Sequence, residues 1–352
     1  MLDCSRCRSA RVRTPGGVRG APGGVPRVKR RVADRPSAIV ALAAIWIACA
    51  AFGPSCSEPG KAPHYTVEVG TTPRCAIYPT AVAYKVFLPS GYATSQRRYP
   101  VLYLLHGASE AKTGTLKGGE IYWDPRCRFL EILNHVAARR PVTQAALRDL
   151  ASQELAREYQ RRFEARPFRP FLIVSVCTDY KVARCEHYLL ETVIPLIEKR
   201  YRTLPGRQNR ALAGPCMGGA FATIIGFRHP ARFGMVYALQ MAVEPYEILL
   251  RQATKALQDR NVKTRPALSE SRRVAKPAEL EYHVVTSIGD VYQSQIEEWH
   301  KDLAASGFPH HFEILQGPHD YPFYGGPGGV SLLYWTSEFF REQDPERGPA
   351  AL

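Results

Sequence analysis

The stretch from Arg210 to His229 constrains the fold of this chain more than any other. It opens with a short apolar segment, residues 210–213, which is typical of a buried strand. A glycine-flanked turn centred on Cys216 follows, and apolar side chains then recur at helical spacing until Pro230 ends the pattern. A strand that passes through an abrupt turn into a helix is the repeating unit of α/β proteins, so the stretch predicts that class.

The turn itself reads Gly214-Pro215-Cys216-Met217-Gly218, the pattern G-x-S-x-G with cysteine in place of serine. So tight a turn brings backbone against its flanking positions, where only glycine fits. The central residue sits at a helix N-terminus, which favours negative charge, so the pattern is typical of a nucleophile. The alternative is a small cysteine buried in an ordinary strand-turn-helix unit. Residues further along the chain distinguish between these two interpretations of the cysteine.

The positive charge of the chain is mostly local. The 352 residues allow one large α/β domain with appendages, and their formal net charge is +15. Residues 1–38 hold ten Lys or Arg against Asp3 and Asp34, which is +8 of that total. The rest shows no Lys/Arg cluster interleaved with aromatic residues, so we expect no nucleic-acid partner.

No pattern in the sequence indicates a metal or a cofactor. No Cys/His spacing is typical of zinc ligands, so no metal is expected. Gly325 to Gly329 is expected to be a flexible loop, because nothing around it forms a phosphate-binding context.

Residues 1–60 are expected to be a leader outside the folded domain. Residues 1–38, rich in Arg, Gly and Pro, are predicted to be disordered. Residues 39–52 form an uncharged apolar run of 14, which suits the core of a signal peptide better than a membrane span. We therefore expect export, with a secreted, periplasmic or cell-envelope location. Cys56 adds a lipoprotein alternative with a lipid anchor, although Gly53-Pro54 matches a lipidation signal poorly; simple cleavage and a retained membrane anchor remain the other outcomes.

Five further cysteines bear on this expectation. In an oxidising compartment four of them could form two disulfides, leaving Cys216 as the free thiol that a nucleophile requires. Alternatively all five stay reduced and only pack. The five are Cys75, Cys127, Cys177, Cys185 and Cys216.

Alternating strand and helix patterns predict one domain over residues 61–345, with a mostly parallel sheet covered by helices on both faces. An insertion at about 109–168, with a helix over 129–138 and a longer one from Thr143 to 163, is interpreted as a helical cap over the mouth of the active site; a surface excursion is the alternative. A second insertion covers about 245–279. The predicted strands are 65–69, 80–88, 99–107, 171–177, 210–213, 235–243, 281–287 and 311–315, and the remaining main helices are 187–201, 217–229, 293–305 and 332–340.

Three blocks of the sequence resemble the esterase D-type family, which includes S-formylglutathione hydrolases, feruloyl esterases, siderophore esterases and mycolyltransferases. The blocks are Tyr-Pro-Val-Leu-Tyr-Leu-Leu-His-Gly at 99–107, Val-Ile-Pro-Leu-Ile-Glu-Lys-Arg-Tyr-Arg-Thr at 193–203 and Ala-Leu-Ala-Gly-Pro-Cys-Met-Gly-Gly at 211–219. The resemblance covers roughly residues 75–340 and implies an α/β-hydrolase fold with a Ser-Asp-His triad. This chain departs from the family at Cys216, as dienelactone hydrolases do.

The fold places nucleophile, acid and histidine in that order along the chain, which indicates Cys216, Asp290 and His319. Asp290 and His319 each follow a predicted strand, and the family's Gly-x-x-Asp and Gly-x-His-Asp segments match them. His319 would take the proton of the thiol, and Asp290 would hold the imidazole. Glu244 and Asp320 are the rival acids, Asp320 being badly placed to reach the ring of its own neighbour.

An oxyanion hole is expected from the backbone N–H groups of Ala108, after the strand 99–107, and of Met217, after the nucleophile. His106, His310 and His311 are interpreted as structural or surface residues. Asp179, after the strand 171–177, lies at the sheet edge where ligand-facing residues collect.

These patterns predict an exported hydrolase of carboxylic esters or thioesters that works through an acyl-cysteine intermediate on a small-molecule ester or acyl substrate. An acyltransferase is a variant in which an alcohol replaces water. From a different class, the alternative is a non-catalytic binding protein of the cell envelope that kept the fold, which the cysteine substitution makes credible.

Overall fold

The structure, a computed structural model, describes residues 63–108, 127–264 and 280–343. The chain divides into two units, Met1–Pro59 and Gly60–Leu352, and every described residue belongs to the second. The predicted leader, its apolar run and Cys56 lie outside the described residues. Among the helices that are described, none is long and apolar enough to span a bilayer.

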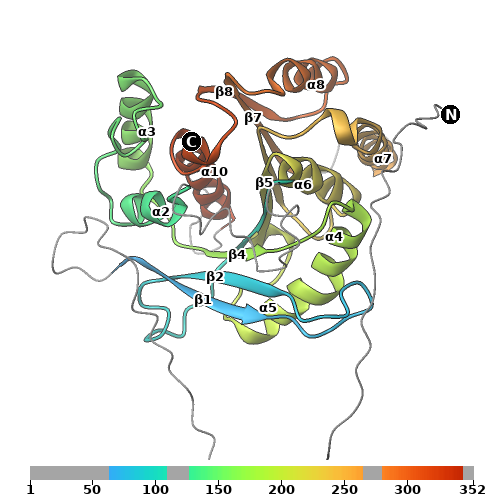
Figure 1. Cartoon of the computed structure of the whole chain (residues 1–352), viewed down its shortest axis with the longest axis horizontal. Helices are drawn as coiled ribbons and strands as arrows, with labels where there is room; N and C mark the ends of the chain where they lie inside the picture. The colour runs from blue at the N-terminus through green and yellow to red at the C-terminus, as the bar shows by residue number, and fades with distance from the viewer. Residues whose placement is uncertain (1–62, 109–126, 265–279, 344–352) are drawn as a thin grey trace, which may run out of the picture. The chain divides into compact units, whose positions relative to one another are not determined.

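An eight-stranded sheet forms the centre of the second unit (Figure 1). Its strand order is β1-β2-β4-β3-β5-β6-β7-β8. β2 runs antiparallel to both of its neighbours, and all pairs from β4 onward are parallel. The mostly parallel sheet predicted from the sequence is confirmed. The strands are Tyr65–Thr71 (β1), Ala83–Pro89 (β2), Val101–Leu105 (β3), Leu172–Val176 (β4), Arg210–Pro215 (β5), Met235–Leu239 (β6), Glu281–Ile288 (β7) and His311–Gln316 (β8).

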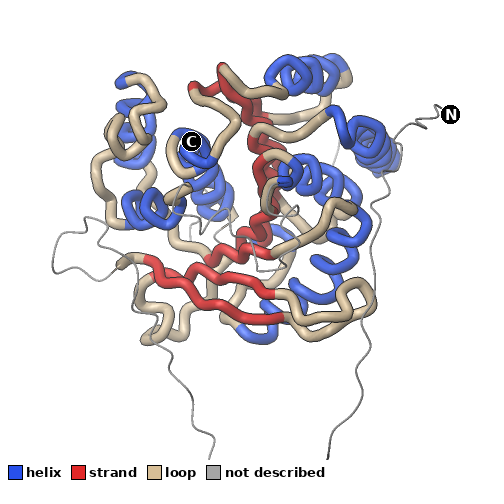
Figure 2. The backbone as a smooth tube through the Cα atoms, viewed as in Figure 1, coloured by secondary structure: helices blue, strands red, loops and turns tan. Residues whose placement is uncertain are grey.

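The inner strands are apolar throughout because helices cover both faces of the sheet. All five residues of β3 are buried, and their side chains alternate between two cores. Tyr103 and Leu105 belong to one core, while Leu102 and Leu104 belong to the other. Figure 2 shows the sheet running between the two groups of helices.

The helices on the first face contribute Tyr188, Phe221 and Trp299 to their core, and those on the second face contribute Phe129 and Leu333. The first group consists of Val182–Tyr188 (α4), Ile194–Arg200 (α5), Met217–Arg228 (α6), Glu247–Thr264 (α7) and Gln293–Ala305 (α8). The second consists of Phe129–Ala137 (α2), Gln153–Ala165 (α3) and Pro327–Glu342 (α10), with the short helix Tyr321–Tyr324 (α9) before the last. Short 3-10 helices cover Arg207–Asn209 and Glu244–Tyr246.

The helix predicted over 187–201 begins earlier and contains a wide turn. A π-helical turn, Leu189–Val193, joins α4 to α5 immediately before Pro195. Proline supplies no N–H to the preceding turn and crowds its carbonyl, and a π turn accommodates both effects.

The first insertion differs from its prediction at the second helix. Thr143 accepts the Ala146 N–H at 3.2 Å in a turn, and Arg148 and Asp149 then adopt positive φ, which ends the helical path. α3 therefore begins only after Ser152, whose hydroxyl caps it. α2 and α3 pack on α10, and residues 109–126 of the predicted cap lie outside the described residues.

Of the loop predicted at Gly325 to Gly329, Gly325 and Gly326 form a turn, and residues 327–329 are helical instead. Pro327 begins α10 at a position where its missing N–H costs nothing, so this helix starts five residues before the predicted boundary. A Cβ on Gly329 would lie 2.5 Å from the Tyr324 carbonyl oxygen. These glycines allow close packing. In the second insertion α7 is helical as expected, and residues 265–279 lie outside the described residues.

Candidate active site

The structure brings Cys216, Asp290 and His319 together at the carboxyl ends of β5, β7 and β8. His319 Nδ1 lies 2.8 Å from Asp290 Oδ1. Cys216 is close enough to the same ring to contribute to raising the pKa of His319. Cys216 is partly exposed, so the sulfur end of this group of three side chains is open to solvent.

Cys216 sits on strained backbone between β5 and α6. Its φ of 53° and ψ of −125° lie in a region that only glycine adopts easily. A Cβ on Gly218 would lie 2.6 Å from the carbonyl oxygens of Leu105 and His106, and one on Gly214 would lie 2.5 Å from the Gly218 carbonyl carbon. The backbone of β3 and of the turn itself thus leaves no room for side chains at either flanking position.

Hydrogen bonds from β6 hold this strained residue in place. The Cys216 N–H donates to the Leu239 carbonyl at 3.0 Å, and its carbonyl accepts the Ala242 N–H at 3.0 Å. Gly219 N–H also donates to that carbonyl as α6 begins. The neighbouring strand therefore fixes the direction in which the thiol points.

Asp290 is a fully buried carboxylate with a complete set of partners. Besides the His319 ring, Oδ1 accepts the Tyr292 N–H at 3.0 Å, and Oδ2 accepts the Thr286 hydroxyl at 2.8 Å. Such donors offset the cost of burying the charge and aim the carboxylate at the ring. The two other candidates for the acid have different surroundings. Asp320 caps α9, and Glu244 is exposed.

The pKa of His319 is raised from 6.5 to about 9. Burial of the ring opposes this shift, but the hydrogen bonds to Asp290 and Cys216 favour the charged imidazolium and outweigh it. Tyr292 and Tyr324 stand edge-on to the ring, with centroids at 5.5 and 5.9 Å. The ring is therefore held in one orientation and binds a proton more tightly than a histidine in water does.

Two buried polar residues that the sequence analysis missed support the His319 loop. Gln240 Nε2 donates to the Ser287 hydroxyl at 2.5 Å and to the Pro318 carbonyl at 3.3 Å. The Ser287 hydroxyl donates to the Gly317 carbonyl. Both residues lie at strand ends beside the site. This position is the one feature of the sequence that could have indicated them.

Met217 and Ala108, the residues predicted to form an oxyanion hole, follow Cys216 and β3 respectively. Met217 is the first residue of α6, where a backbone N–H has no partner within the helix. Ala108 follows β3, and its carbonyl accepts the Tyr180 hydroxyl at 3.0 Å. The Thr178 N–H donates to His106 Nε2 at 2.8 Å, which ties the end of β3 to the end of β4 and gives His106 the structural place expected for it.

Two tyrosines that the sequence analysis did not single out lie near the thiol. Burial raises the pKa of Tyr246 to about 12, with contributions from charge on Cys216, Tyr180 and Tyr292. Burial and charge on Cys216 likewise raise the pKa of Tyr292. Interactions of this kind weaken with distance, so Tyr246 and Tyr292 belong to the surroundings of Cys216.

Other predicted residues have different places. Asp179 pairs with Arg184 at 3.1 Å, so it acts within its own turn. His310 lies 2.7 Å from His300, remote from Cys216 in the fold. In the part of the chain that the structure describes, the thiols of Cys75 and Cys185 are free as well, so the predicted pair of disulfides does not form. Cys185 is buried in the core and Cys75 accepts the Tyr78 N–H, which leaves the two thiols in separate environments.

The sheet, its crossovers and the strained strand-to-helix turn define an α/β-hydrolase fold, as the sequence predicted. The sequence profile of the family described as "Putative esterase" matches residues 77–344. The chain belongs to this esterase family, as the three sequence blocks indicated.

Individual relatives are distant. The chain is 27% identical over 161 residues to an endo-1,4-beta-xylanase/feruloyl esterase of Xylanibacter ruminicola, which is 42% of this chain and 18% of that protein. Among solved structures, a ferulic acid esterase superposes with a TM-score of 0.54 at 23% identity, covering 78% of this chain and 99% of the other. A fluorophosphonate-binding serine hydrolase of Staphylococcus aureus gives 0.51 at 14% identity, covering 78% and 99%. At these identities the superpositions establish the fold.

Proposed function

We propose that the chain hydrolyses carboxylic esters or thioesters through an acyl-cysteine intermediate. The observation that carries the proposal is the hydrogen bond between His319 and the buried Asp290, beside a partly exposed Cys216 that interacts with the same ring. Membership of the esterase family supports the same reaction class.

In the first half-reaction, His319 takes the proton of the thiol and the sulfur of Cys216 attacks the carbonyl carbon. The N–H groups of Met217 and Ala108 would receive the oxyanion that develops on the carbonyl oxygen. As the carbonyl re-forms, the bond to the alkoxide or thiolate breaks, and that leaving group takes the proton from His319.

The second half-reaction reverses these roles. His319 removes a proton from water, whose oxygen attacks the acyl carbon, and the sulfur of Cys216 leaves with the proton. Asp290 stays ionised throughout and stabilises each imidazolium that forms. An alcohol in place of water would give the acyltransferase variant.

We infer that an aromatic group on the acyl side suits this site. Tyr246 and Tyr292 lie near the thiol, and aromatic rings pair favourably with one another. The feruloyl and ferulic acid esterases among its relatives carry the names of aromatic acyl substrates, which agrees with this inference.

We also propose that the protein is exported. The basic segment, the apolar run at residues 39–52 and the small residues after it support export, with cleavage, a retained anchor or lipidation at Cys56 as the possible processing outcomes.

Hydrolysis of p-nitrophenyl acetate and methyl ferulate tests the proposed chemistry. We expect Cys216→Ala to lower kcat/KM by about 10³-fold or more, because it removes the attacking atom. Iodoacetamide should inactivate the wild type to the same extent, with alkylation found at Cys216 by mass spectrometry.

Cys75→Ala is the matched control, because Cys75 is another partly exposed thiol, hydrogen-bonded to Tyr78 rather than His319. It should keep both the activity and the sensitivity to iodoacetamide. If Cys216→Ala turned over substrate at the wild-type rate, the acyl-cysteine mechanism would be wrong. A wild type that binds esters without turnover would instead identify a binding protein.

A further inference from the structure

A second cluster of side chains lies far from Cys216, at the other end of the last two strands. Glu281 and His283 begin β7, and His311 is the first residue of β8, directly paired with His283. Asp290 and His319 follow the opposite ends of the same strands. We propose that Glu281, His283 and His311 form a binding site for a divalent transition-metal ion of the Zn²⁺ type.

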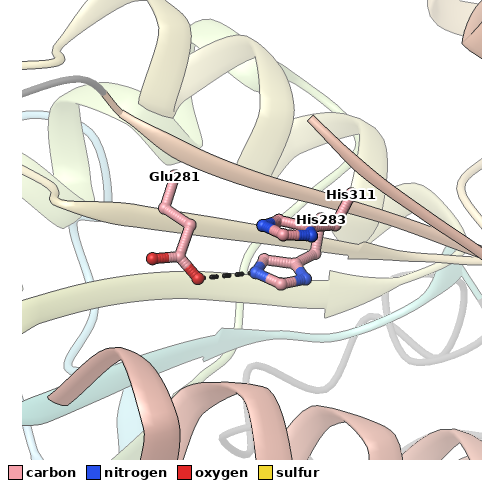
Figure 3. Close-up of side chains that lie close together, drawn as sticks. All are labelled: Glu281, His283 and His311. Atoms are coloured by element: carbon pink, nitrogen blue, oxygen red, sulfur yellow. Dashed lines mark hydrogen bonds and ion pairs between the residues drawn. The ribbon is translucent and has the colours of Figure 1, made fainter. Parts of the chain in front are cut away.

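The three side chains already converge. One ligand atom from each lies within 4.8 Å of the other two. His283 Nε2 is 2.7 Å from Glu281 Oε1, and the His283 and His311 rings stack with centroids 4.4 Å apart. Figure 3 shows the rings one above the other, each with a nitrogen on the side of the Glu281 carboxylate. Two imidazoles and a carboxylate make a donor set that Zn²⁺ prefers, with a fourth position left for water.

Small movements suffice to close this set around an ion. Tetrahedral zinc with ligands at about 2.0 to 2.1 Å separates neighbouring ligand atoms by about 3.3 Å. The contact between Glu281 and His283 must therefore open slightly, and the His311 nitrogen must approach. His311 is exposed, so its ring can tilt out of the stack. To bind the ion through Nε2, His283 takes the neutral tautomer that carries its proton on Nδ1.

The surroundings fix one ligand. His283 is buried against Tyr237, at 5.8 Å, and Trp335, at 4.9 Å between ring centroids, so its ring is positioned in advance.

Such an ion would join the start of β7 to the start of β8. Binding to the folded state alone raises stability in proportion to the logarithm of the free metal concentration. The site would therefore stabilise the edge of the sheet whose other end positions Asp290 and His319, without touching the substrate.

Isothermal titration of the full, tag-free chain with ZnCl₂ tests the proposal. We expect one site per chain, weakened by about tenfold or more in His311→Ala and in Glu281→Gln. His187→Ala, which removes an exposed histidine from α4, is the matched control and should bind as the wild type does. Cys216→Ala should also retain the site, which separates it from zinc capture by the candidate active site.

A thermal melt supplies a second readout. Zn²⁺ should raise the Tm of the wild type and of His187→Ala but leave that of His311→Ala unchanged, with circular dichroism confirming that each variant is folded. The proposal is overturned if the wild type binds no Zn²⁺, if His311→Ala and Glu281→Gln bind it as well as the wild type does, or if Cys216→Ala abolishes binding.

Discussion

At the scale of single residues, the candidate site depends on a buried charge. The carboxylate of Asp290 has no exposed surface, and its partners are Thr286, the Tyr292 backbone and the ring of His319. A buried anion with such partners favours a cation beside it, which is one reason why His319 holds a proton more tightly than a histidine in water does. The same coupling links the site to the stability of the fold.

This coupling predicts a pH dependence of stability. The pKa of His319 is about 9 in the folded chain and 6.5 in its ordinary state, so folding favours the protonated ring. The resulting stabilisation is fully present below pH 6.5 and is lost as the pH rises through 9, and its upper limit is about 3 kcal/mol. Urea denaturation of the wild type and of His319→Gln at pH 6 and pH 9.5 should show a difference in the free energy of unfolding that shrinks at the higher pH. A difference independent of pH would contradict the assignment.

At the scale of elements, the sequence predicted all eight strands because inner strands of a covered sheet are continuous apolar runs. Helix boundaries were less predictable. Thr143 and Ser152 offer equivalent local capping chemistry, and the left-handed backbone at Arg148 and Asp149 decides between them. Likewise, glycine content indicated a loop at 325–329, whereas residues 327–329 begin α10 and the two glycines before them pack against distant backbone.

The site could be predicted to a similar degree. The proximity of Asp290 and His319 to the end of β5 could be predicted because each follows a strand, and parallel strands bring their carboxyl ends to one edge. Gln240 and Ser287 carry no motif, since their roles arise from hydrogen bonds to the His319 loop that only the folded chain makes. The stack of His283 and His311 depends on strand register, which apolar runs leave open.

The strand-to-helix turn supports a prediction at this scale. Gly218→Ala should lower the free energy of unfolding by about 3 kcal/mol, because the new Cβ meets the backbone carbonyls of Leu105 and His106, which cannot move aside. Gly307→Ala is the control: its φ is 67° with no atom within 4 Å, so backbone strain alone should cost about 1 kcal/mol. Equal losses in urea denaturation would show that crowding at the turn is not the cause.

At the scale of the whole folded unit, the two layers of helices have different roles. α6 carries Cys216 at its start and packs between the sheet and α7, so the first layer belongs to the candidate site. The second layer joins α2 and α3 of the first insertion to α10, the last helix (Figure 1). Glu338 on α10 connects this helix to the end of α3. Its carboxylate pairs with Arg166, which follows α3, at 2.6 Å and with Arg341 of α10 itself at 2.9 Å.

This junction gives a test of how the insertion is held. Glu338 is nearly buried, so Glu338→Gln removes the charge that compensates both Arg166 and Arg341. Arg166 is half exposed, so its guanidinium can turn to water in the variant. We therefore expect the free energy of unfolding to fall by about 2 kcal/mol, a value between those for surface and buried ion pairs. The control is Glu158→Gln, whose pairs with Arg161 and Arg162 lie within one helix at the surface and should together contribute less than about 1 kcal/mol. Urea denaturation compares them directly, and similar losses in the two variants would mean that α3 is held on α10 by apolar contacts alone.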